Sequence, residues 1–454
     1  MFIDFLTESF EKNSGKEAII WKEESYRYEY LTKRVKEWEE EIRNEKIGKG
    51  AVVMLEADFS PNAVALFLAL TEEGCIIVPL TSSVRSKKSE FTEIAQGEFS
   101  IVIDEKDNVS ISRLPNSADH ELYGKLRNLN HPGLVLFSSG STGKSKAAVH
   151  DLTKILEKFK AQKRGFRSIT FLLYDHIGGV NTMLHMLSNA GCIITVQDRS
   201  PDNVLRSIEK HKADLLPTTP TFINLMLLSK SYREHDLSSL KLITYGTEPM
   251  PESTLRHFHE LFPNIRLLQT YGLSEVGILS SRSKDSGSLW VKVGGEGFET
   301  RVVEGILQIK ARSAMLGYLN APSPFTEDGW FNTGDSVEVD GDYIRILGRK
   351  SEIINVGGQK VYPAEVESVI QEMEEVSEVT VYGEKNVIMG NIVCADVTLN
   401  KEEKPREFSK RLREYCSKKL EDYKVPIKVR ITSEDQHSER FKKIRYRPPQ
   451  DKKD

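Results

Sequence analysis

The sequence predicts an α/β protein: a large N-terminal domain of helix-covered sheets with a barrel-like β region, followed by a small α+β C-terminal domain. Three observations support this prediction. Before residue 291, short apolar runs alternate with amphipathic, charge-rich stretches, a pattern typical of parallel sheets covered by helices. Strand-like pieces separated by tight turns follow. After Gly348 a new unit begins, in which helical and extended patterns are mixed.

The first part of the chain supplies the expected strands and helices of the covered sheets. Six short apolar runs predict buried strands at residues 52–55, 76–80, 134–137, 169–173, 192–196 and 240–245. Six amphipathic stretches predict helices at residues 31–44, 62–73, 153–160, 180–188, 201–210 and 253–262.

The pattern changes at Val291. Strand-like pieces at 300–303, 306–309 and 343–347 are separated by short turns such as that at 340–342, which indicates an antiparallel, barrel-like region. Beyond it we expect helices near 363–373 and 407–420, with strands near 379–382 and 392–399. We therefore predict a boundary at about residue 350, giving domains 1–350 and 351–454.

Composition and charge exclude several functional classes. The chain has 454 residues, with 63 lysines and arginines against 67 acidic residues, and this near-balance argues against a dedicated nucleic-acid binder. The longest apolar run, 63–70, is far shorter than the ~20 residues that cross a bilayer. The N-terminus lacks the basic region of a signal peptide, and the four cysteines are solitary, so we expect a cytoplasmic protein.

Charge is unevenly placed along the chain. Residues 401–454 carry 18 lysines and arginines against 11 acidic residues. This segment is either a solvated face or a surface that meets anionic groups such as a nucleotide, coenzyme A phosphates or an acidic partner protein.

A loop suited to phosphate binding follows the apolar run 134–137. Small residues let backbone N–H groups wrap an anion, while hydroxyls add donors and lysine adds charge; the residues are Ser138, Ser139, Gly140, Ser141, Thr142, Gly143 and Lys144. A Walker P-loop would require glycine at position 138, where this chain has serine, so the loop fails that pattern by one residue.

The segment 137–147 resembles the phosphate loop of the acyl-adenylating superfamily, which comprises acyl-CoA synthetases, nonribosomal peptide adenylation domains and luciferases. Ser145 and Ala147 replace the pattern's proline and last glycine. Further motifs of the family occur in the same order, at Tyr245-Gly246-Thr247-Glu248-Pro249, Thr270-Tyr271-Gly272-Leu273-Ser274-Glu275, Gly329 to Asp335, Gly348-Arg349, Gly357-Gly358, Pro363 to Glu367 and Lys443-Ile444.

This resemblance implies ATP-dependent activation of a carboxylic acid to acyl-AMP and pyrophosphate, with Mg²⁺. The phosphate loop would hold the β- and γ-phosphates. Glu275, with Thr142 nearby, would ligate Mg²⁺, and Ser274 would hydrogen-bond the α-phosphate. Tyr271 would lie on the adenine, Asp335 would accept the ribose hydroxyls, and Arg349 would reach the ribose. Thr247, Glu248, Pro249, Thr270 and Gly272 complete the expected nucleotide site.

The acid pocket is predicted from a second stretch of the resemblance. The segment 172–179 resembles the family segment in which an aromatic residue precedes a histidine, so His176 is expected to orient the carboxylate. Asp175, Tyr245 and Gly246 are expected beside it. Amino-acid-activating relatives use an aspartate here, but it aligns with His176, one place on from Asp175, which favours an acid without an amine. The chain is shorter than most family members and has no extra insertion that would form a long-chain lipid tunnel, which favours a small or medium acid.

The resemblance also implies that the C-terminal domain is mobile and carries a catalytic lysine. Alignment on Ile444 selects Lys443, with Lys442 as the alternative. Ser351 would be the hinge, and Gly357 and Gly358 would line the tunnel for the acceptor thiol, which belongs to coenzyme A or to the phosphopantetheine of a carrier protein. Two alternatives remain: a stand-alone amino-acid adenylation enzyme that loads a carrier protein, and an inactive nucleotide sensor.

Overall fold

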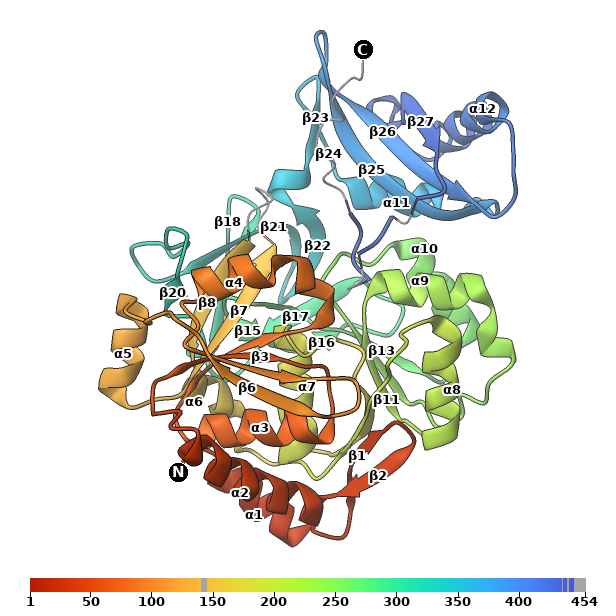
Figure 1. Cartoon of the computed structure of the whole chain (residues 1–454). Coiled ribbons are helices and arrows are strands. Elements are labelled where there is room, and N and C mark those ends of the chain that lie inside the picture. The colour runs from red at the N-terminus through yellow and green to blue at the C-terminus, as the bar shows by residue number, and fades with distance from the viewer. Residues whose placement is uncertain (140–144, 435, 439–440, 445–454) are drawn as a thin grey trace.

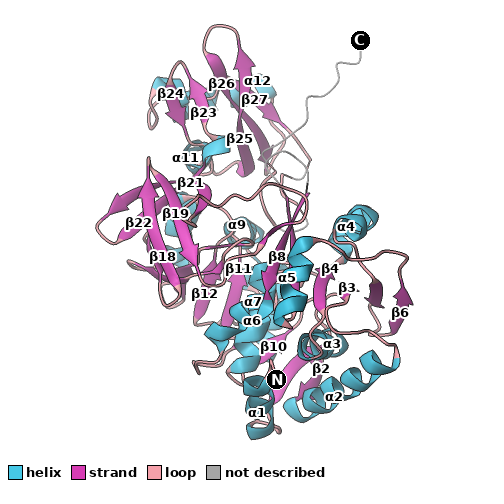
Figure 2. Ribbon diagram, turned by 90° about the vertical axis from the view of Figure 1, so that its left-hand side faces the viewer, coloured by secondary structure: helices cyan, strands magenta, loops and turns pink. Residues whose placement is uncertain are grey.

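The computed structural model describes residues 1–139, 145–434, 436–438 and 441–444. Over these residues the chain forms two seven-stranded sheets, a six-stranded antiparallel sheet and a five-stranded C-terminal sheet (Figures 1 and 2). The C-terminal sheet stands apart from the others in both views. The predicted α/β class with a barrel-like region is confirmed.

The first seven-stranded sheet has the order β13-β12-β11-β9-β10-β1-β2, and only β2 pairs antiparallel in it. Its strands are short and mostly buried, as in a sheet covered on both faces. They are β1 (Glu17–Trp21), β2 (Glu24–Arg27), β9 (Arg167–Ile169), β10 (Cys192–Ile194), β11 (Leu215–Thr218), β12 (Leu242–Tyr245) and β13 (Arg266–Gln269).

The second seven-stranded sheet has the order β20-β8-β7-β4-β3-β5-β6, with a parallel centre and antiparallel edges. Its strands are β3 (Val52–Glu56), β4 (Ile76–Leu80), β5 (Phe99–Ile103), β6 (Val109–Arg113), β7 (Gly133–Ser139), β8 (Ser145–Asp151) and β20 (Gly317–Tyr318).

Two helices that are apolar on all sides lie between these sheets. α3 (Pro61–Glu72) and α7 (Ile177–Ser188) share one buried cluster with side chains of both sheets, as expected for helices without a polar face. The other large-domain helices are amphipathic or lie at the margins: α1 (Asp4–Lys12), α2 (Tyr28–Asn44), α4 (Lys88–Ile94), α5 (Glu121–Leu129), α6 (Leu152–Leu156), α8 (Pro201–His211), α9 (Pro220–Ser229) and α10 (Glu252–Leu261).

The predicted barrel-like region is a six-stranded antiparallel sheet of order β16-β17-β22-β21-β19-β18. It packs on a small core of its own that includes Tyr271. The strands of this region are β14 (Gly272–Leu273), β15 (Gly277–Ile278), β16 (Ser280–Ser283), β17 (Trp290–Gly294), β18 (Phe298–Val303), β19 (Ile306–Ala311), β21 (Phe331–Asp340) and β22 (Tyr343–Arg349), of which β14 and β15 form a separate pair.

The C-terminal sheet takes all its strands from residues after 353 and has its own core. Two helices pack on it, α11 (Pro363–Ile370) and α12 (Pro405–Cys416). Its strands are β23 (Ile354–Val356), β24 (Gln359–Val361), β25 (Val376–Asn386), β26 (Gly390–Leu399) and β27 (Lys428–Ile431).

Two predicted strands end earlier than expected: 192–196 ends at Ile194, and 169–173 ends at its first residue. The apolar run 169–173 contributes only Ile169 to β9, because the chain then leaves the sheet and carries buried Phe171 and Leu173 beyond the strand's carboxyl end. β11 and α9, which begin at Leu215 and Pro220, were not predicted from the sequence.

Candidate active site

Most of the predicted site residues follow neighbouring strands of the first sheet. His176 comes after β9, Glu248 after β12 and Tyr271 after β13, and these three strands are joined side by side through β11. The carboxyl ends of parallel strands meet at one edge of a sheet, where open α/β folds bind ligands. The topology therefore brings residues nearly 100 positions apart to one edge.

Tyr271 and Asp335, which are buried, form a polar group with the more exposed Arg349 next to this edge. The Tyr271 hydroxyl donates to Asp335 Oδ2 at 2.5 Å, and Arg349 Nε lies 2.9 Å from Asp335 Oδ1. Asp335 on β21 and Arg349 at the end of β22 are direct partners in the strand register. Each carboxylate oxygen accepts more than one hydrogen bond, so Asp335 could still accept ribose hydroxyls.

The electrostatics of this group are set by burial. Burial raises the pKa of the Asp335 carboxyl, while Arg349 and Tyr271 oppose that shift. Burial and then the charge of Asp335 raise the pKa of Tyr271 well above its usual value, so its hydroxyl stays protonated and donates.

Glu275 is hydrogen-bonded to β20, the strand that pairs with β8 after the phosphate loop. The Tyr318 hydroxyl donates to Glu275 Oε1 at 2.6 Å, and Tyr318 belongs to β20, the antiparallel neighbour of β8. Lys146 of β8 lies 5.3 Å from the centre of the Tyr318 ring. Ser274 is held through its carbonyl oxygen, which accepts from His150 Nε2 at 2.6 Å.

The phosphate loop joins two antiparallel strands. β7 reaches Ser139, β8 begins at Ser145, and these residues pair in register. Ser138 is half-buried on β7. A Walker P-loop would instead lead into a helix, so the P-loop alternative is excluded. The remaining predicted loop residues, Gly140, Ser141, Thr142, Gly143 and Lys144, lie outside the described residues.

The turn after β12 approaches the end of β13 closely. A Cβ on Gly246 would lie 2.6 Å from the Thr270 carbonyl oxygen, so only glycine fits there. Thr247 follows with φ of 75°, a strained conformation for a β-branched residue that occurs mostly at functional sites. The Tyr245 side chain is buried in the core cluster around the first sheet and is not among the residues that line the acid pocket described below.

His176 and Asp175 have different surroundings. His176 caps the N-terminus of α7: its Nδ1 accepts from the Gly178 N–H at 3.0 Å. A Cβ on the next residue, Gly179, would lie 2.0 Å from the Leu173 carbonyl oxygen, so glycine lets the helix start this close to the preceding loop. Asp175 is buried and accepts from the Thr81 hydroxyl at 3.0 Å.

Lys442 approaches His176 from the C-terminal segment. Its Nζ lies 3.5 Å from His176 Nε2. Because Nδ1 accepts a hydrogen bond, the neutral imidazole carries its hydrogen on Nε2, and an ammonium is a donor only. Two donors therefore converge from different domains, an arrangement that suits an anionic oxygen.

Lys443, selected by alignment, has a different environment. Its Nζ pairs with Glu367 Oε2 at 3.1 Å, and that carboxylate is fully buried in the C-terminal unit. Its backbone N–H donates to Glu248 Oε2 at 3.2 Å, while Glu248 Oε1 accepts from the Thr221 N–H at 2.8 Å. Glu248 thus anchors the C-terminal segment to the start of α9.

A small hollow surrounds the His176–Lys442 contact. Its walls are largely apolar and include two residues that sequence reasoning missed, Arg199 and Phe441. The Arg199 guanidinium is held by the Phe171 carbonyl oxygen at 2.9 Å and by Asp58 at 3.2 Å. Arg199 could have been found from the sequence because it follows the apolar run of β10 and therefore lies at the same sheet edge.

The predicted hinge and tunnel residues lie away from this hollow. Ser351 lies in a short 3₁₀ segment, η4 (Lys350–Glu352), directly after β22. Gly357 and Gly358 form the turn between β23 and β24 with φ of 55° and 88°. The Gly357 N–H donates to the Met389 carbonyl oxygen at the tip of the β25–β26 hairpin, so the structure does not bring these glycines to His176.

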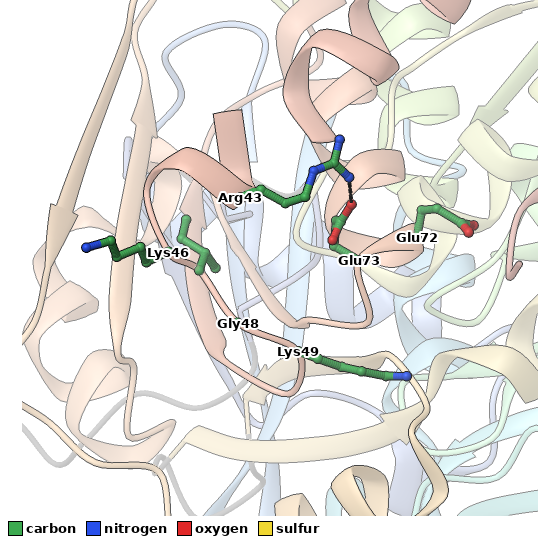
Figure 3. Close-up of a pocket in the computed structure, with 7 residues that line it drawn as sticks. Arg43, Lys46, Gly48, Lys49, Glu72 and Glu73 are labelled. Carbon is green, nitrogen blue, oxygen red and sulfur yellow. Dashed lines mark hydrogen bonds and ion pairs between the residues drawn. The ribbon is translucent and has the colours of Figure 1, made fainter. Parts of the chain in front are cut away.

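A second hollow lies at the C-terminal ends of α2 and α3 (Figure 3). Arg43 pairs there with Glu73 at 2.5 Å, and Glu72 accepts from the backbone N–H groups of Phe2 and Ile3. Arg43 and Glu73 thus neutralise each other, and helix C-termini disfavour anions, so we do not assign the nucleotide to this hollow.

Two absences hold for the described part of the chain. No helix there is long and apolar enough to cross a membrane. The same residues contain no cluster of three or more histidine, cysteine or acidic side chains arranged to hold a metal ion. The four cysteines are buried and unpaired.

Two solved structures share this fold. The crystal structure of the anthranilate CoA ligase AuaEII with anthranoyl-AMP has a TM-score of 0.83 at 20% identity and covers 97% of this chain and 95% of that one. ATP-bound MatB from Rhodopseudomonas palustris has a TM-score of 0.79 at 21% identity, covering 97% of each chain.

Sequence relatives point the same way. An indoleacetate–CoA ligase of Aromatoleum aromaticum is 29% identical over 296 residues, 59% of this chain but only 57% of that protein. A putative acyl–CoA ligase of Bacillus subtilis, YdaB, is 24% identical over 463 residues, covering 90% of this chain and 91% of that protein.

Two family profiles match in chain order. The profile described as AMP-binding enzyme matches residues 6–304, and that described as AMP-binding enzyme C-terminal domain matches residues 365–442. The first match alone spans more than half of the chain, and the second ends at Lys442. The resemblance drawn from the motifs is thereby confirmed, and the chain belongs to the AMP-binding enzyme family.

Proposed function

We propose that the protein activates a small or medium carboxylic acid with ATP and then transfers the acyl group to the thiol of coenzyme A. In the first step a carboxylate oxygen attacks the α-phosphorus of ATP, the bond to the bridging oxygen breaks, and pyrophosphate leaves. In the second step the thiol sulfur attacks the acyl carbon and AMP leaves. The names of the relatives, which are ligases of indoleacetate and other acyl groups, support this reaction class.

The observation that carries the proposal is the convergence of Lys442 and His176 at the apolar hollow. Two anions, a carboxylate and the α-phosphate, must approach each other in adenylation. An ammonium beside a fixed N–H donor lowers their repulsion and stabilises the charge that develops in the transition state. We therefore assign the catalytic role to Lys442 rather than to Lys443, which is engaged with Glu367.

We assign nucleotide binding to Tyr271, Asp335 and Arg349 and to the residues around them. Asp335 would accept the ribose hydroxyls, Tyr271 would lie against the adenine, Arg349 would stabilise the ionised form of Asp335, and Ser274 would face the α-phosphate. Phosphates would be held by Ser138, Ser139 and the loop that follows. Mg²⁺ fits Glu275, because this cation is commonly bound by one or two carboxylates together with substrate phosphates. It would neutralise phosphate charge.

We also propose that the chain divides at residue 350 and that Ser351 is the hinge. Strand β22 ends at Arg349, and the last sheet begins at Ile354 without sharing a strand with the large domain. Rotation about this point would exchange Lys442 for the Gly357-Gly358 turn at the site. The positive φ of both glycines suits a backbone that passes close to a thiol-bearing arm.

The substrate is proposed to lack an amine. Asp175 is buried against Thr81, whereas the hollow next to His176 is lined by Phe171, Leu172 and Leu173. An ammonium group would have no carboxylate partner among the residues that line this hollow.

Acid-dependent exchange of pyrophosphate into ATP tests the proposal. The panel should contain linear acids, aromatic acids such as benzoate, anthranilate and indoleacetate, and amino acids. Exchange stimulated by a non-amino acid is expected, followed by thioester formation when coenzyme A is added. Stimulation by amino acids alone would favour a carrier-loading adenylation enzyme. Nucleotide binding without exchange for any acid would favour a sensor.

A further inference from the structure

The C-terminal segment that carries Lys442 reaches the large domain through an unusual residue. Phe441 has φ of 51°, in the left-handed region that bulky residues rarely enter. Such a conformation persists only where the surroundings hold it in place. The contacts of Phe441 therefore indicate what fixes this segment.

The Phe441 ring is seated in an aromatic socket of the large domain. Its centroid lies 5.1 Å from that of Phe171 and 5.7 Å from that of Phe222, which it meets edge to face at 89°. His437 of the same segment stacks on its other side at 5.5 Å. Phe171 and Phe222 belong to the buried core around the first sheet, so the socket is part of a rigid body.

The backbone of Phe441 is fixed at the same place. The Thr219 hydroxyl donates to the Phe441 carbonyl oxygen at 2.8 Å. The same oxygen of Thr219 accepts from the Phe222 N–H at 3.1 Å and caps the N-terminus of α9. One threonine thus joins the start of a large-domain helix to the residue before Lys442.

A second anchor follows directly after Lys442. The Lys443 N–H donates to Glu248, and its ammonium pairs with Glu367 of the C-terminal unit. Lys442 therefore lies between two anchored neighbours, and its ammonium lies 3.5 Å from His176 Nε2.

We propose that Phe441 is a positioning residue: its packing against the contacting pair Phe171 and Phe222 docks the C-terminal segment and aims Lys442 at the acid pocket. Lys443, with Glu248 and Glu367, completes the anchor. This inference rests on the proposed function for its catalytic consequence but not for the docking itself. It also explains the tandem lysines, because one acts on the substrate and the other holds the segment.

The test compares Phe441→Ala, Phe441→Leu and Phe262→Ala in the full chain. Phe262 is the matched control, because it is a partly buried aromatic residue packed on the same core but outside the site. The first readout is hydrogen–deuterium exchange without ligand. We expect faster exchange of the Thr221 and Phe222 amides in Phe441→Ala but not in Phe262→Ala, since those amides are held where the segment docks.

The second readout separates the half-reactions, using the acid that supports wild-type exchange. In Phe441→Ala, ATP–pyrophosphate exchange should fall by about 10²-fold, the scale for a catalytic group misplaced by about 1 Å. Conversion of supplied acyl-AMP to thioester should stay within about twofold, because that step does not use Lys442. Phe441→Leu should restore most of the exchange.

The outcomes separate the two proposals. Unchanged amide exchange in Phe441→Ala would overturn the docking role, and equal loss in both half-reactions would overturn the positioning role. If the wild type shows no acid-dependent exchange with any acid, the proposed function fails, while the amide-exchange result still decides whether Phe441 docks the segment.

Discussion

The two halves of the candidate site are held in different ways. On the nucleotide side, Tyr271, Asp335 and Arg349 come from one domain and are fixed by bonds to each other, two of them on adjacent strands. On the acid side, Lys442 reaches His176 from a separate unit and is aimed by its neighbours in sequence. One half is built into the fold, and the other is docked onto it.

This difference suggests a division of tasks. A built-in group keeps its geometry throughout the reaction and suits binding of a nucleotide that must stay through both steps. A docked group can be withdrawn, which suits a charge that is needed only while two anions meet. Substitutions in the first half should therefore weaken nucleotide binding, whereas substitutions in the second should affect one half-reaction.

Replacing Ser351 with proline should have the largest effect on the docked half. Proline fixes φ near −65° and also restricts Lys350, so the C-terminal unit should be trapped in one orientation. We expect one half-reaction to proceed and the other to be lost. Separate assays of acyl-AMP formation and of thioester formation from supplied acyl-AMP measure this, and normal rates in both would show that Ser351 is not the hinge.

Asp335→Ala should have the second-largest effect, a weaker binding of the nucleotide. Loss of a charge-assisted hydrogen bond costs about 1.5–3 kcal/mol, which corresponds to roughly ten- to hundredfold in the dissociation constant of AMP. Titration calorimetry of the variant gives this value directly. Wild-type affinity would remove Asp335 from the ribose site.

Glu367→Gln should loosen the docked segment without touching the nucleotide half. The substitution keeps the bond from the Val381 N–H but removes the charge that pairs with Lys443. Because Lys443 retains some solvent contact, we expect a loss of about 0.5–1.5 kcal/mol, or about three- to tenfold in pyrophosphate exchange. AMP affinity should not change, and a parallel fall in AMP affinity would contradict the separation of the two halves.

Tyr271→Phe should have the smallest effect and should depend on pH. The Tyr271 hydroxyl lowers the pKa of Asp335, so its removal raises that pKa further. AMP binding needs the ionised carboxylate and is lost as the pH falls through the pKa of Asp335. In Tyr271→Phe this loss should begin at a higher pH, with about 1 kcal/mol weaker binding at neutral pH. Identical pH profiles for both proteins would show that the hydroxyl does not act on Asp335.

The built-in half was largely predictable from the sequence, and the docked half was not. Asp335, Arg349 and Tyr271 lie in local motifs, and the pairing of β21 with β22 follows from a short hairpin at 340–342. The choice between Lys442 and Lys443 depends on the positive φ of Phe441 and on partners more than 190 residues away, such as Glu248. No local pattern encodes those contacts. Alignment on Ile444 selects Lys443, whereas our proposal for Lys442 comes from these distant contacts.

The early end of β9 has a similar cause. The apolar run 169–173 is as hydrophobic as a strand, but its second half is buried at the sheet edge by Phe222 and by Phe441 from the C-terminal segment. An apolar run looks the same in the sequence whether it is buried as a strand of the sheet or as a loop covered by side chains from another segment. Phe441 and Arg199 were not predicted from the sequence because their places in the site depend on partners far along the chain, Phe171 and Asp58.

The most direct test of the account compares Lys442→Ala with Lys443→Ala in the two half-reactions. We expect Lys442→Ala to lose acid-dependent ATP–pyrophosphate exchange by about 10²–10³-fold, the scale for removing one charge-stabilising donor, and to convert supplied acyl-AMP to thioester at close to the wild-type rate. Lys443→Ala should lose exchange by less than about tenfold, as an anchor rather than a reacting group. Near-normal exchange in Lys442→Ala, together with a loss of orders of magnitude in Lys443→Ala, would contradict the account.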